Sequence, residues 1–391
     1  MNLGNNKNKF GYYQVGDFTT YSKIEALELS RISGKFPEWR FNDLEFSCYN
    51  WTLEPTESLE ELYAQRARQI RENYDHVVLF FSGGADSTNM LNAFIKNNIP
   101  FEEIATLDYW SANPDPNYQF HIEQIRVSYP QIKQWQDQGI NFVHRRLDIS
   151  DITKKVLQDD QYRLTRAYYS NTFWGTNHFS KSFIRETNPE YQRIIESGKK
   201  LVFVWGCEKP RIFREDDRYC VKFADYTDTT VPTRTQIVNR EWEYDEFFYW
   251  APECVDLICK QGHTIKNFLS QHKIECNYRD YRKNDPIELP PLSVIFSDRP
   301  EVAQYTQGLS YRELINVLVY PDWDPATFSA GKIPGVIFNP YDAIWLKDSH
   351  WRTHIDRLSS HLQHIDPYWH NDLSNLNLGL KSCISQPYFL N

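Results

Sequence analysis

The chain has 391 residues, of which 41% are hydrophobic and 24% are charged, and its formal net charge is −9. These values are typical of a folded protein of about two or three domains, and they exclude a mainly disordered or collagen-like chain. The acidic balance argues against non-specific binding to duplex nucleic acid, which depends on basic surface. It leaves open a nucleic-acid substrate held in a local basic cleft.

The sequence also indicates where the protein acts. Its longest apolar runs, 77–81 and 201–207, fall well short of the roughly 18 residues that a membrane span needs. Residues 1–12 lack the apolar stretch of a signal peptide. The Cys residues are scattered and do not form a disulfide framework. We therefore expect a cytoplasmic protein with no membrane partner.

Helices and strands are expected to alternate through the first half of the chain. Apolar residues recur every three or four positions over 57–74, which predicts a helix. The run His76-Val-Val-Leu-Phe-Phe81 is typical of a buried parallel strand. Further strands are expected at 103–108, 140–147, 200–205 and 219–223, and further helices at 88–96, 118–138, 152–157 and 165–173. This alternation predicts a parallel sheet with right-handed crossovers.

The expected fold class is therefore α/β, with a doubly wound parallel sheet of five strands. We assign residues 1–74 to an N-terminal extension, 75–225 to the α/β domain and 226–391 to a mainly helical C-terminal region. Helices are expected there at 247–269, 312–318 and 349–364. The last of these carries His350, His354, His361 and His364. Two His four positions apart on a helix can bind a metal, but no acidic residue completes a site, so we interpret them as a solvated face.

The sharpest motif is Ser82-Gly-Gly-Ala-Asp-Ser87, directly after the first strand of the expected sheet. A Gly pair lets the backbone turn tightly and brings its N–H groups close to an oxyanion. The helix that opens next favours negative charge at its N-terminus. Ser82 and Ser87 add hydroxyl donors, and Asp86 offers a carboxylate for Mg²⁺. The motif thus predicts a phosphate-binding loop that is neither a Walker loop nor a dinucleotide fingerprint.

This string resembles the PP-loop of the ATP pyrophosphatases, the superfamily that includes the asparagine synthetase C-terminal domain and 7-cyano-7-deazaguanine synthase. The resemblance covers the α/β part of the chain, and the aromatic texture of the remainder resembles phage-encoded members. It implies that ATP and Mg²⁺ are cofactors, that ATP is cleaved to AMP and pyrophosphate, and that a second substrate is adenylated. It also implies that Ser82, Gly83, Gly84, Ala85, Asp86 and Ser87 bind the nucleotide. For a phage protein, the host cytoplasm would be the location.

Two other expected strand ends supply candidate site residues. Asp108 ends the second strand, where ligands of open α/β sheets bind, and is a candidate nucleotide contact. The fourth strand is followed by Gly206, Lys209 and Arg211. Gly206 permits close backbone approach. Lys209 and Arg211 would place two cations where the pyrophosphate leaving group develops charge. Asp86, Lys209 and Arg211 are therefore the candidate catalytic residues, with Asp86 also the candidate metal ligand.

Several features bear on the second substrate. A glutaminase of the asparagine synthetase type needs a Cys exposed by removal of Met, but position 2 is Asn2 and the first Cys is Cys48. The nucleophile is then an amine, free ammonia, or ammonia from a separate glutaminase. His178 and Lys181, between the third and fourth strands, are candidates for binding the second substrate. The second substrate itself stays unidentified.

The favoured function is an AMP-forming ATP pyrophosphatase that adenylates its substrate for amide or amine bond formation. Two alternatives remain open. A sulfur transferase or a phosphoadenylylsulfate reductase-like enzyme would need a reactive thiol near the loop, for which Cys207 is the candidate. A non-catalytic nucleotide-binding protein would keep the loop without turnover.

Overall fold

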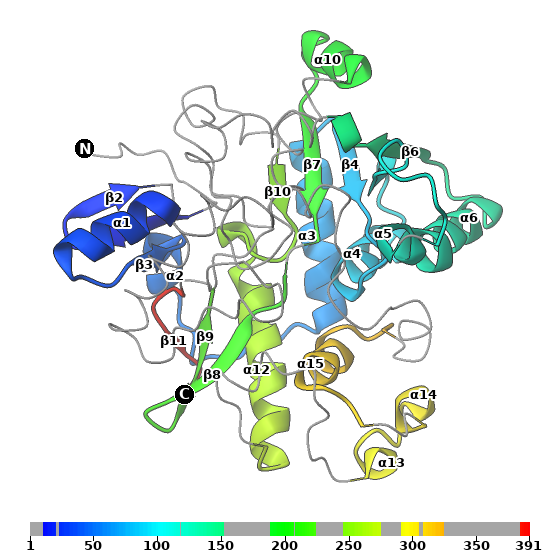
Figure 1. Ribbon diagram of the computed structural model, residues 1–391. Coiled ribbons are helices and arrows are strands. Elements are labelled where there is room, and N and C mark those ends of the chain that lie inside the picture. The colour runs from blue at the N-terminus through cyan, green and yellow to red at the C-terminus, as the bar shows by residue number, and fades with distance from the viewer. Residues whose placement is uncertain are drawn as a thin grey trace.

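The computed structural model describes residues 11–20, 23–117, 119–151, 188–206, 208–223, 245–274, 291–304, 308–323 and 384–391. The N-terminal part forms a small antiparallel sheet of order β2-β1-β3, made of β1 (Tyr12–Val15), β2 (Phe18–Thr20) and β3 (Glu38–Arg40). It lies with α1 (Lys23–Ser33) and α2 (Asp43–Ser47) at the left of Figure 1. Trp39, Phe41 and Phe46 anchor this part in the core, each at most 1% exposed.

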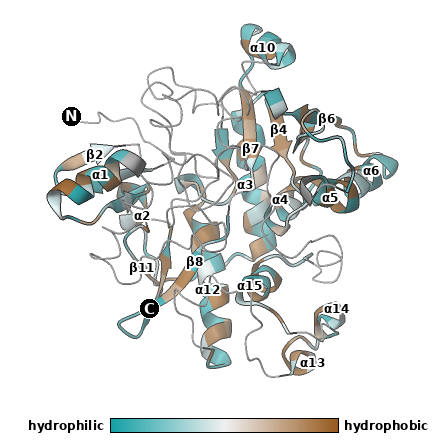
Figure 2. Ribbon diagram, in the orientation of Figure 1, coloured by the Kyte–Doolittle hydropathy of each residue, from teal (hydrophilic) through white to brown (hydrophobic). Residues whose placement is uncertain are grey.

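The main sheet has five parallel strands, which confirms the expected α/β class and strand number. They are β4 (His76–Phe80), β5 (Glu103–Asp108), β6 (Val143–Asp148), β7 (Leu201–Trp205) and β10 (Asp245–Phe247), in the order β10-β7-β4-β5-β6. The chain thus builds outward from β4 to β6, then returns to the other side of β4 for β7 and β10. Figure 2 shows hydrophobic residues concentrated in β4 and β7, as expected of central strands covered on both faces.

The fifth strand of this sheet is not the one expected at 219–223. That segment is β9 (Arg218–Lys222), which pairs antiparallel with β8 (Arg211–Glu215) in a second sheet. The cause is the turn between them: Asp216 and Asp217 both have positive φ, 48° and 61°, which gives the tight hairpin that twisted strands prefer. β11 (Tyr388–Phe389) completes this sheet, in the order β11-β9-β8.

The strand that takes the fifth place, β10, lies beyond residue 225, in the region that the sequence assigned to the helical part. Its first two residues are Asp245 and Glu246, so it lacks the apolar run that marks a buried strand. The helix expected over 247–269 correspondingly starts later. A short 3-10 turn, η3 (Pro252–Cys254), leads into α12 (Val255–Gln271).

The helices on the main sheet were largely expected. α3 (Leu59–Asn73) begins with a capping box between Ser58 and Glu61, and it packs on α4 (Ala85–Lys96) and α12. The segment expected to be one helix over 118–138 is α5 (Gln119–Glu123), a π-helical turn η1 (Gln124–Ser128) and α6 (Tyr129–Asp137). α10 (Pro189–Glu196) packs on β7.

Three further helices lie among the described residues of the C-terminal region. α15 (Tyr311–Val319), expected at 312–318, packs on α12. α13 (Leu292–Ile295) and α14 (Pro300–Ala303) lie beside each other at the lower right of Figure 1. The helices expected at 152–157, 165–173 and 349–364, with the four His of the last, lie outside the described residues.

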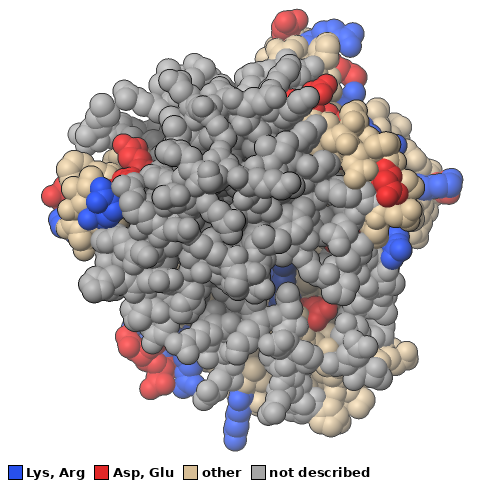
Figure 3. All heavy atoms as spheres, in the orientation of Figure 1, with Lys and Arg blue, Asp and Glu red and all other residues tan. Residues whose placement is uncertain are grey.

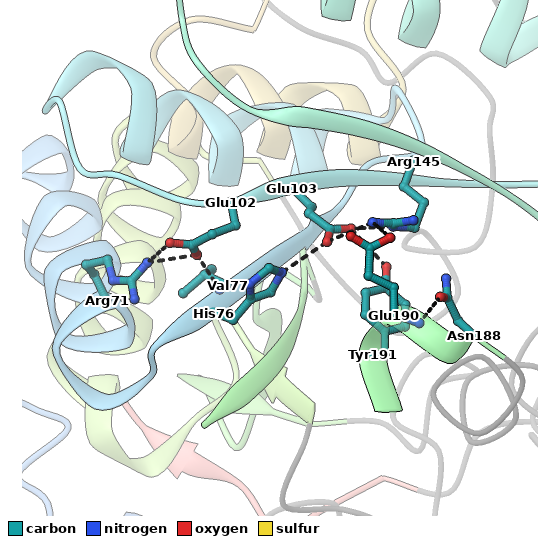
Figure 4. Close-up of polar contacts among 9 residues, drawn as sticks. All are labelled: Arg71, His76, Val77, Glu102, Glu103, Arg145, Asn188, Glu190 and Tyr191. Carbon is teal, nitrogen blue, oxygen red and sulfur yellow. Dashed lines mark hydrogen bonds and ion pairs between the residues drawn. The ribbon is translucent and has the colours of Figure 1, made fainter. Parts of the chain in front are cut away.

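A buried polar cluster joins the amino ends of the central strands (Figure 4). Glu103, 2% exposed, starts β5 and accepts hydrogen bonds from Arg145 Nε at 2.5 Å and from the Tyr191 hydroxyl at 3.2 Å. His76 Nε2 lies 3.0 Å from the same carboxylate. The neighbouring Glu102 holds Arg71 and the N–H of Val77. One carboxylate thus connects β4, β5, β6 and α10 at the sheet edge opposite to the Ser82–Ser87 loop.

Candidate functional site

The loop of residues 82–87 connects β4 to α4 at the carboxyl edge of the sheet. Gly83 has a φ of +82°, and a Cβ atom at this position would lie 2.6 Å from Ser128 Oγ. Glycine is therefore needed twice, for the left-handed conformation and for the close approach of η1. Gly84 is the N-cap residue of α4, and Ala85 is the first residue of the helix.

The serine hydroxyls hold the loop in a tight ring. Ser82 Oγ lies 3.2 Å from Ser87 Oγ and 3.3 Å from the N–H of Gly84, while Ser87 Oγ donates to the Gly84 carbonyl at 3.1 Å. The N–H groups of the first helical turn, Ala85 to Ser87, have no acceptor within the helix. An anion at this helix start would meet those donors and the positive end of the helix dipole.

The loop lies where the strand order reverses. β4 and β7 are neighbours, with Phe80 opposite Trp205 at their carboxyl ends. Gly206 follows at once, and a Cβ atom there would lie 2.8 Å from Ser87 Cα and 2.9 Å from its backbone nitrogen. Gly206 thus allows the backbones of the two segments to approach closely, and its role in nucleotide binding stays a prediction. In parallel sheets, ligands bind in the crevice at such a reversal.

Asp86 is the centre of the polar contacts around the loop. Lys209 Nζ donates to Asp86 Oδ1 at 2.9 Å, and the Tyr320 hydroxyl donates to the same oxygen at 2.5 Å. Burial works to raise the pKa of Asp86, but the charges of Lys209 and Arg312 outweigh burial and hold that pKa below its usual value. Asp86 is therefore an anion at neutral pH, and its charge is compensated from within the protein.

Lys209 is 0% exposed, an unusual position for an ammonium group. Besides Asp86, its Nζ lies 3.7 Å from Glu208 Oε1 and 5.6 Å from the centre of the Tyr320 ring. Two carboxylates and an aromatic face together compensate the loss of water around the cation. The sequence placed Lys209 on the same edge as the loop, and the structure confirms that it contacts the loop.

Three other charged groups act on this pair. Burial raises the pKa of Glu208, and the charge of Asp86 adds to that rise, while Lys209, Arg312 and Arg211 oppose it. Arg211 is the first residue of β8 and is 2% exposed. Its charge is one of those that lower the pKa of Glu208, so Arg211 lies near that carboxylate. It is the second cation that the sequence placed after the fourth strand.

A second tyrosine fixes the backbone of the loop. The Tyr249 hydroxyl donates to the Asp86 carbonyl at 2.8 Å and accepts from Asn89 Nδ2 at 3.0 Å. Its ring lies 5.7 Å from that of Tyr320 and 6.0 Å from that of Tyr63. Tyr63 in turn donates to the Val319 carbonyl at 2.6 Å, which seats the end of α15 against α3.

Asp108 is at the carboxyl end of β5, as expected, but its contacts are with β6. Arg146 Nε lies 3.3 Å from its carboxylate, and the guanidinium of Arg146 lies over the Tyr129 and Trp110 rings at 4.9 and 5.5 Å. Burial raises the pKa of Asp108, against the lowering effect of Arg146. Asp108 is thus a buried carboxylate paired with a half-exposed arginine, and its role as a nucleotide contact stays a prediction.

The carboxylates around the loop fit a magnesium ion that shares substrate oxygens. Within the described ranges, no group of three or more His, Cys, Asp or Glu could hold a metal alone. Mg²⁺ in nucleotide sites takes one or two carboxylates and completes its shell with phosphate oxygens and water. Asp86 and Glu208, which both lie within 4 Å of Lys209 Nζ, provide that number.

Sequence reasoning missed four residues of this site: Glu208, Tyr249, Arg312 and Tyr320. Glu208 had a signal, because it is a charged residue between Gly206 and Lys209 in a strand-end loop. The other three reach the loop from more than 150 positions away along the chain, and no local pattern marks them. Cys207, His178 and Lys181 lie outside the part of the chain that the structure describes.

No protein-family model matches the chain, and no curated protein does. Among the described residues, no helix is long and apolar enough to cross a lipid bilayer. On the face drawn in Figure 3, the described acidic and basic side chains are intermixed, which gives no basic tract on these residues of the kind that non-specific nucleic-acid binding needs. The loop of residues 82–87 and the side chains around it are therefore the features that bear on the function.

Proposed function

We propose that the protein is an AMP-forming ATP pyrophosphatase of the adenylating ligase or amidotransferase kind. The observation that carries the proposal is the loop of residues 82–87, with Ser128 packed closely against its Gly83 and with a buried lysine bound to its aspartate. The reversal of strand order at β4 and β7 supports a doubly wound arrangement and a nucleotide in the crevice there.

The residues of the site would share the work of cleavage between the α- and β-phosphates. The N–H groups at the start of α4 would hold the phosphate oxygens, and Lys209 would meet the negative charge that grows on the pyrophosphate. Arg211 and Arg312 would add positive charge at the same edge. Fixed donors of this kind act without reorganising, so positioning and electrostatics would carry most of the catalysis.

A bound Mg²⁺ would be held by Asp86 and Glu208 and would supply charge neutralisation to the phosphate oxygens. The second substrate, with an oxygen able to attack the α-phosphate, would then be adenylated, and an amine or ammonia would displace AMP. The amine or ammonia would be supplied from solution or by a separate protein.

The buried cysteines that the structure describes give no support to the alternative of a thiol-dependent sulfur enzyme, whose candidate Cys207 lies outside the described residues. Burial raises the pKa of Cys220 to about 12, that of Cys254 to about 11 and that of Cys259 to about 12. Such thiols are poor nucleophiles at neutral pH. A nucleotide sensor without turnover remains the competing proposal.

The product of the nucleotide tests the proposal. ATP labelled at the α-phosphate is incubated with the protein, Mg²⁺ and a deproteinised cell extract as a source of second substrates. Chromatography should show AMP, with one pyrophosphate released for each. Asp86→Asn should abolish AMP formation, and Lys133→Ala, on the surface of α6, is the control. ADP as the product would refute the proposal, and bound but intact ATP would favour the sensor.

A further inference from the structure

We propose that the ammonium of Lys209 occupies the position beside Asp86 that Mg²⁺ takes when Mg²⁺ and pyrophosphate bind. Lys209 then pairs with the phosphate oxygens instead. In the structure Lys209 neutralises the Asp86 carboxylate. When Mg²⁺ and a pyrophosphate group enter, the metal takes over Asp86 and Lys209 takes over the phosphate oxygens. This inference rests on the proposed function and adds to it a mechanism that couples metal binding to anion binding.

The ammonium of Lys209 is already paired with a carboxylate. It is 0% exposed, and its closest acidic partner is Asp86 Oδ1 at 2.9 Å. A lysine in that position has little affinity left for a pyrophosphate, because its charge is already compensated. An anion that takes Lys209 alone would remove the closest counter-charge from the largely buried Asp86 carboxylate, which is unfavourable.

The carboxylate of Asp86 likewise already has a cation beside it. A metal ion that takes Asp86 alone would place its double charge beside the ammonium of Lys209. The two cations would repel each other at a separation of a few ångström. Each ligand alone therefore meets a penalty that the other removes, and linkage requires that the gain be equal in both directions.

Other groups would keep Asp86 in place during the exchange. The Tyr320 hydroxyl donates to its carboxylate, and Tyr249 donates to its backbone carbonyl. The ring of Tyr320 is buried, 5.7 Å from that of Tyr249, which keeps its hydroxyl beside the carboxylate. Asp86 can then change its cation without changing its position.

The exchange predicts an unusual mutant. Asp86→Asn removes the charge that holds Lys209, so the affinity for inorganic pyrophosphate in EDTA should rise by about tenfold or more, the worth of a hydrogen bond to a charged group. The enhancement by Mg²⁺ that the exchange predicts for the wild type should disappear. Isothermal titration calorimetry with pyrophosphate, in EDTA and in Mg²⁺, measures both effects.

The matched control is Asp137→Asn. It makes the same change of net charge and releases Lys133, which binds Asp137 at 3.0 Å on the exposed surface of α6. Pyrophosphate affinity should not change in this variant. An equal gain in both variants, or no gain in Asp86→Asn, would overturn the exchange. Wild-type protein that binds no pyrophosphate with or without Mg²⁺ would instead overturn the proposed function.

A reciprocal variant keeps the inference testable if Asp86→Asn does not fold. Lys209→Gln removes the competing cation, so Mn²⁺ alone should bind about tenfold or more tightly than it does to the wild type. Electron paramagnetic resonance of free Mn²⁺ measures this without nucleotide or turnover. Unchanged or weaker Mn²⁺ binding would show that Lys209 does not compete for Asp86 and would overturn the exchange.

Discussion

Gly83 and Ser128 show how single residues shape the candidate site. A side chain at position 83 is excluded by the left-handed backbone and by the Ser128 hydroxyl, 2.6 Å from where a Cβ atom would be. Ser128 reaches this point from a π-helical turn, a feature that often accompanies functional sites. The space beside Gly83 is thus filled by a residue of an irregular helical turn that lies further along the chain.

Gly83→Ala should therefore abolish Mg²⁺-dependent pyrophosphate binding and also lower stability. The left-handed conformation alone costs an alanine about 1–2 kcal/mol, and the contact with Ser128 adds to that. Gly139→Ala is the matched control, because Gly139 has a φ of +83° with nothing within 4 Å of a Cβ atom. It should show the stability loss without the binding loss in calorimetry. Equal binding in the two variants would contradict this account of the loop.

The sequence predicted those site residues that local chemistry marks. The Gly pair, the hydroxyls and Asp86 follow a recognisable strand, and the position of Gly206 and Lys209 follows from parallel strands ending at one edge. Tyr320 and Tyr249 could not be predicted this way. They are ordinary aromatic residues in buried segments, and only the packing of α15 and of the chain after β10 brings their hydroxyls to Asp86.

The helix α15 contacts the loop through a cluster of tyrosines whose rings are tilted or edge-on to one another. Tyr63 on α3 bonds the Val319 carbonyl, and the next residue, Tyr320, bonds Asp86. The rings of Tyr63 and Tyr320 lie 6.4 Å apart. The seating of α15 and the contact with the carboxylate therefore depend on different hydroxyl groups of one aromatic cluster.

Replacing each tyrosine by phenylalanine should separate these roles. Tyr320→Phe removes the donor to Asp86, so it should weaken Mg²⁺-dependent pyrophosphate binding as well as stability. Tyr63→Phe leaves the Val319 carbonyl without its donor and should cost about 1–3 kcal/mol of stability, with binding unchanged. Urea unfolding and calorimetry measure the two quantities. Unaltered binding in Tyr320→Phe would mean that this phenol has no part in holding Asp86 for a ligand.

The cluster at the amino ends of the strands gives a prediction with a pH dependence. Burial works to raise the pKa of Glu103, but the hydrogen bonds and charges of His76 and Arg145 outweigh it, so the folded-state pKa lies below 4.5. The stability that Glu103 contributes is then present above its unfolded pKa and is lost as the pH falls through the lower folded value.

Glu103→Gln should destabilise the protein at pH 7 by about 3 kcal/mol, the cost of breaking a buried ion pair. The difference from the wild type should shrink as the pH falls below about 4. Glu102→Gln, the neighbouring residue with a side chain 37% exposed, should cost about 1 kcal/mol or less. Guanidinium unfolding between pH 3 and pH 7 measures both. A pH-independent loss in Glu103→Gln would refute the electrostatic explanation.

The strands show what an element needs in order to be predictable. β4 and β7 are continuous apolar runs and could be located from their residues. β10 has three residues, two of them acidic, and takes its place because it pairs with β7 from Asp245 to Phe247. β9 has the alternation of a strand, but its sheet is decided by the Asp216-Asp217 turn, since a tight hairpin forces antiparallel pairing with β8.

Residues 384–391, the last described segment, pack against the N-terminal part of the chain and against β9. Tyr388 stacks on Trp51 with ring centres 5.0 Å apart, and its hydroxyl lies 3.2 Å from Asp43 Oδ1. The N–H of Leu390 donates to the Tyr219 carbonyl at 2.8 Å, and its side chain is 0% exposed. The N-terminal part, β9 and α12 therefore share one core with residues 384–391.

Leu390→Ala should cost about 2–5 kcal/mol, as is usual for a buried leucine truncated to alanine. Leu44→Ala removes the same atoms from a side chain that is 74% exposed and should change stability by about 0.5 kcal/mol or less. The free energy of urea unfolding measures the two. A similar small effect in both variants would show that the contacts of Leu390 with β9 and α12 contribute little to the core.

The pairing of β11 with β9 also sets an order of events during synthesis. Tyr219 and Asn391 are hydrogen-bonded partners 172 positions apart. At typical translation rates the ribosome needs roughly ten to thirty seconds to cover that distance. During that interval the hairpin of β8 and β9 presents an edge that its final neighbour has not yet reached, and an open edge is a template for pairing with other chains. Yield of soluble protein should therefore depend on translation speed over the later half of the message, or on a chaperone that covers the hairpin until β11 emerges.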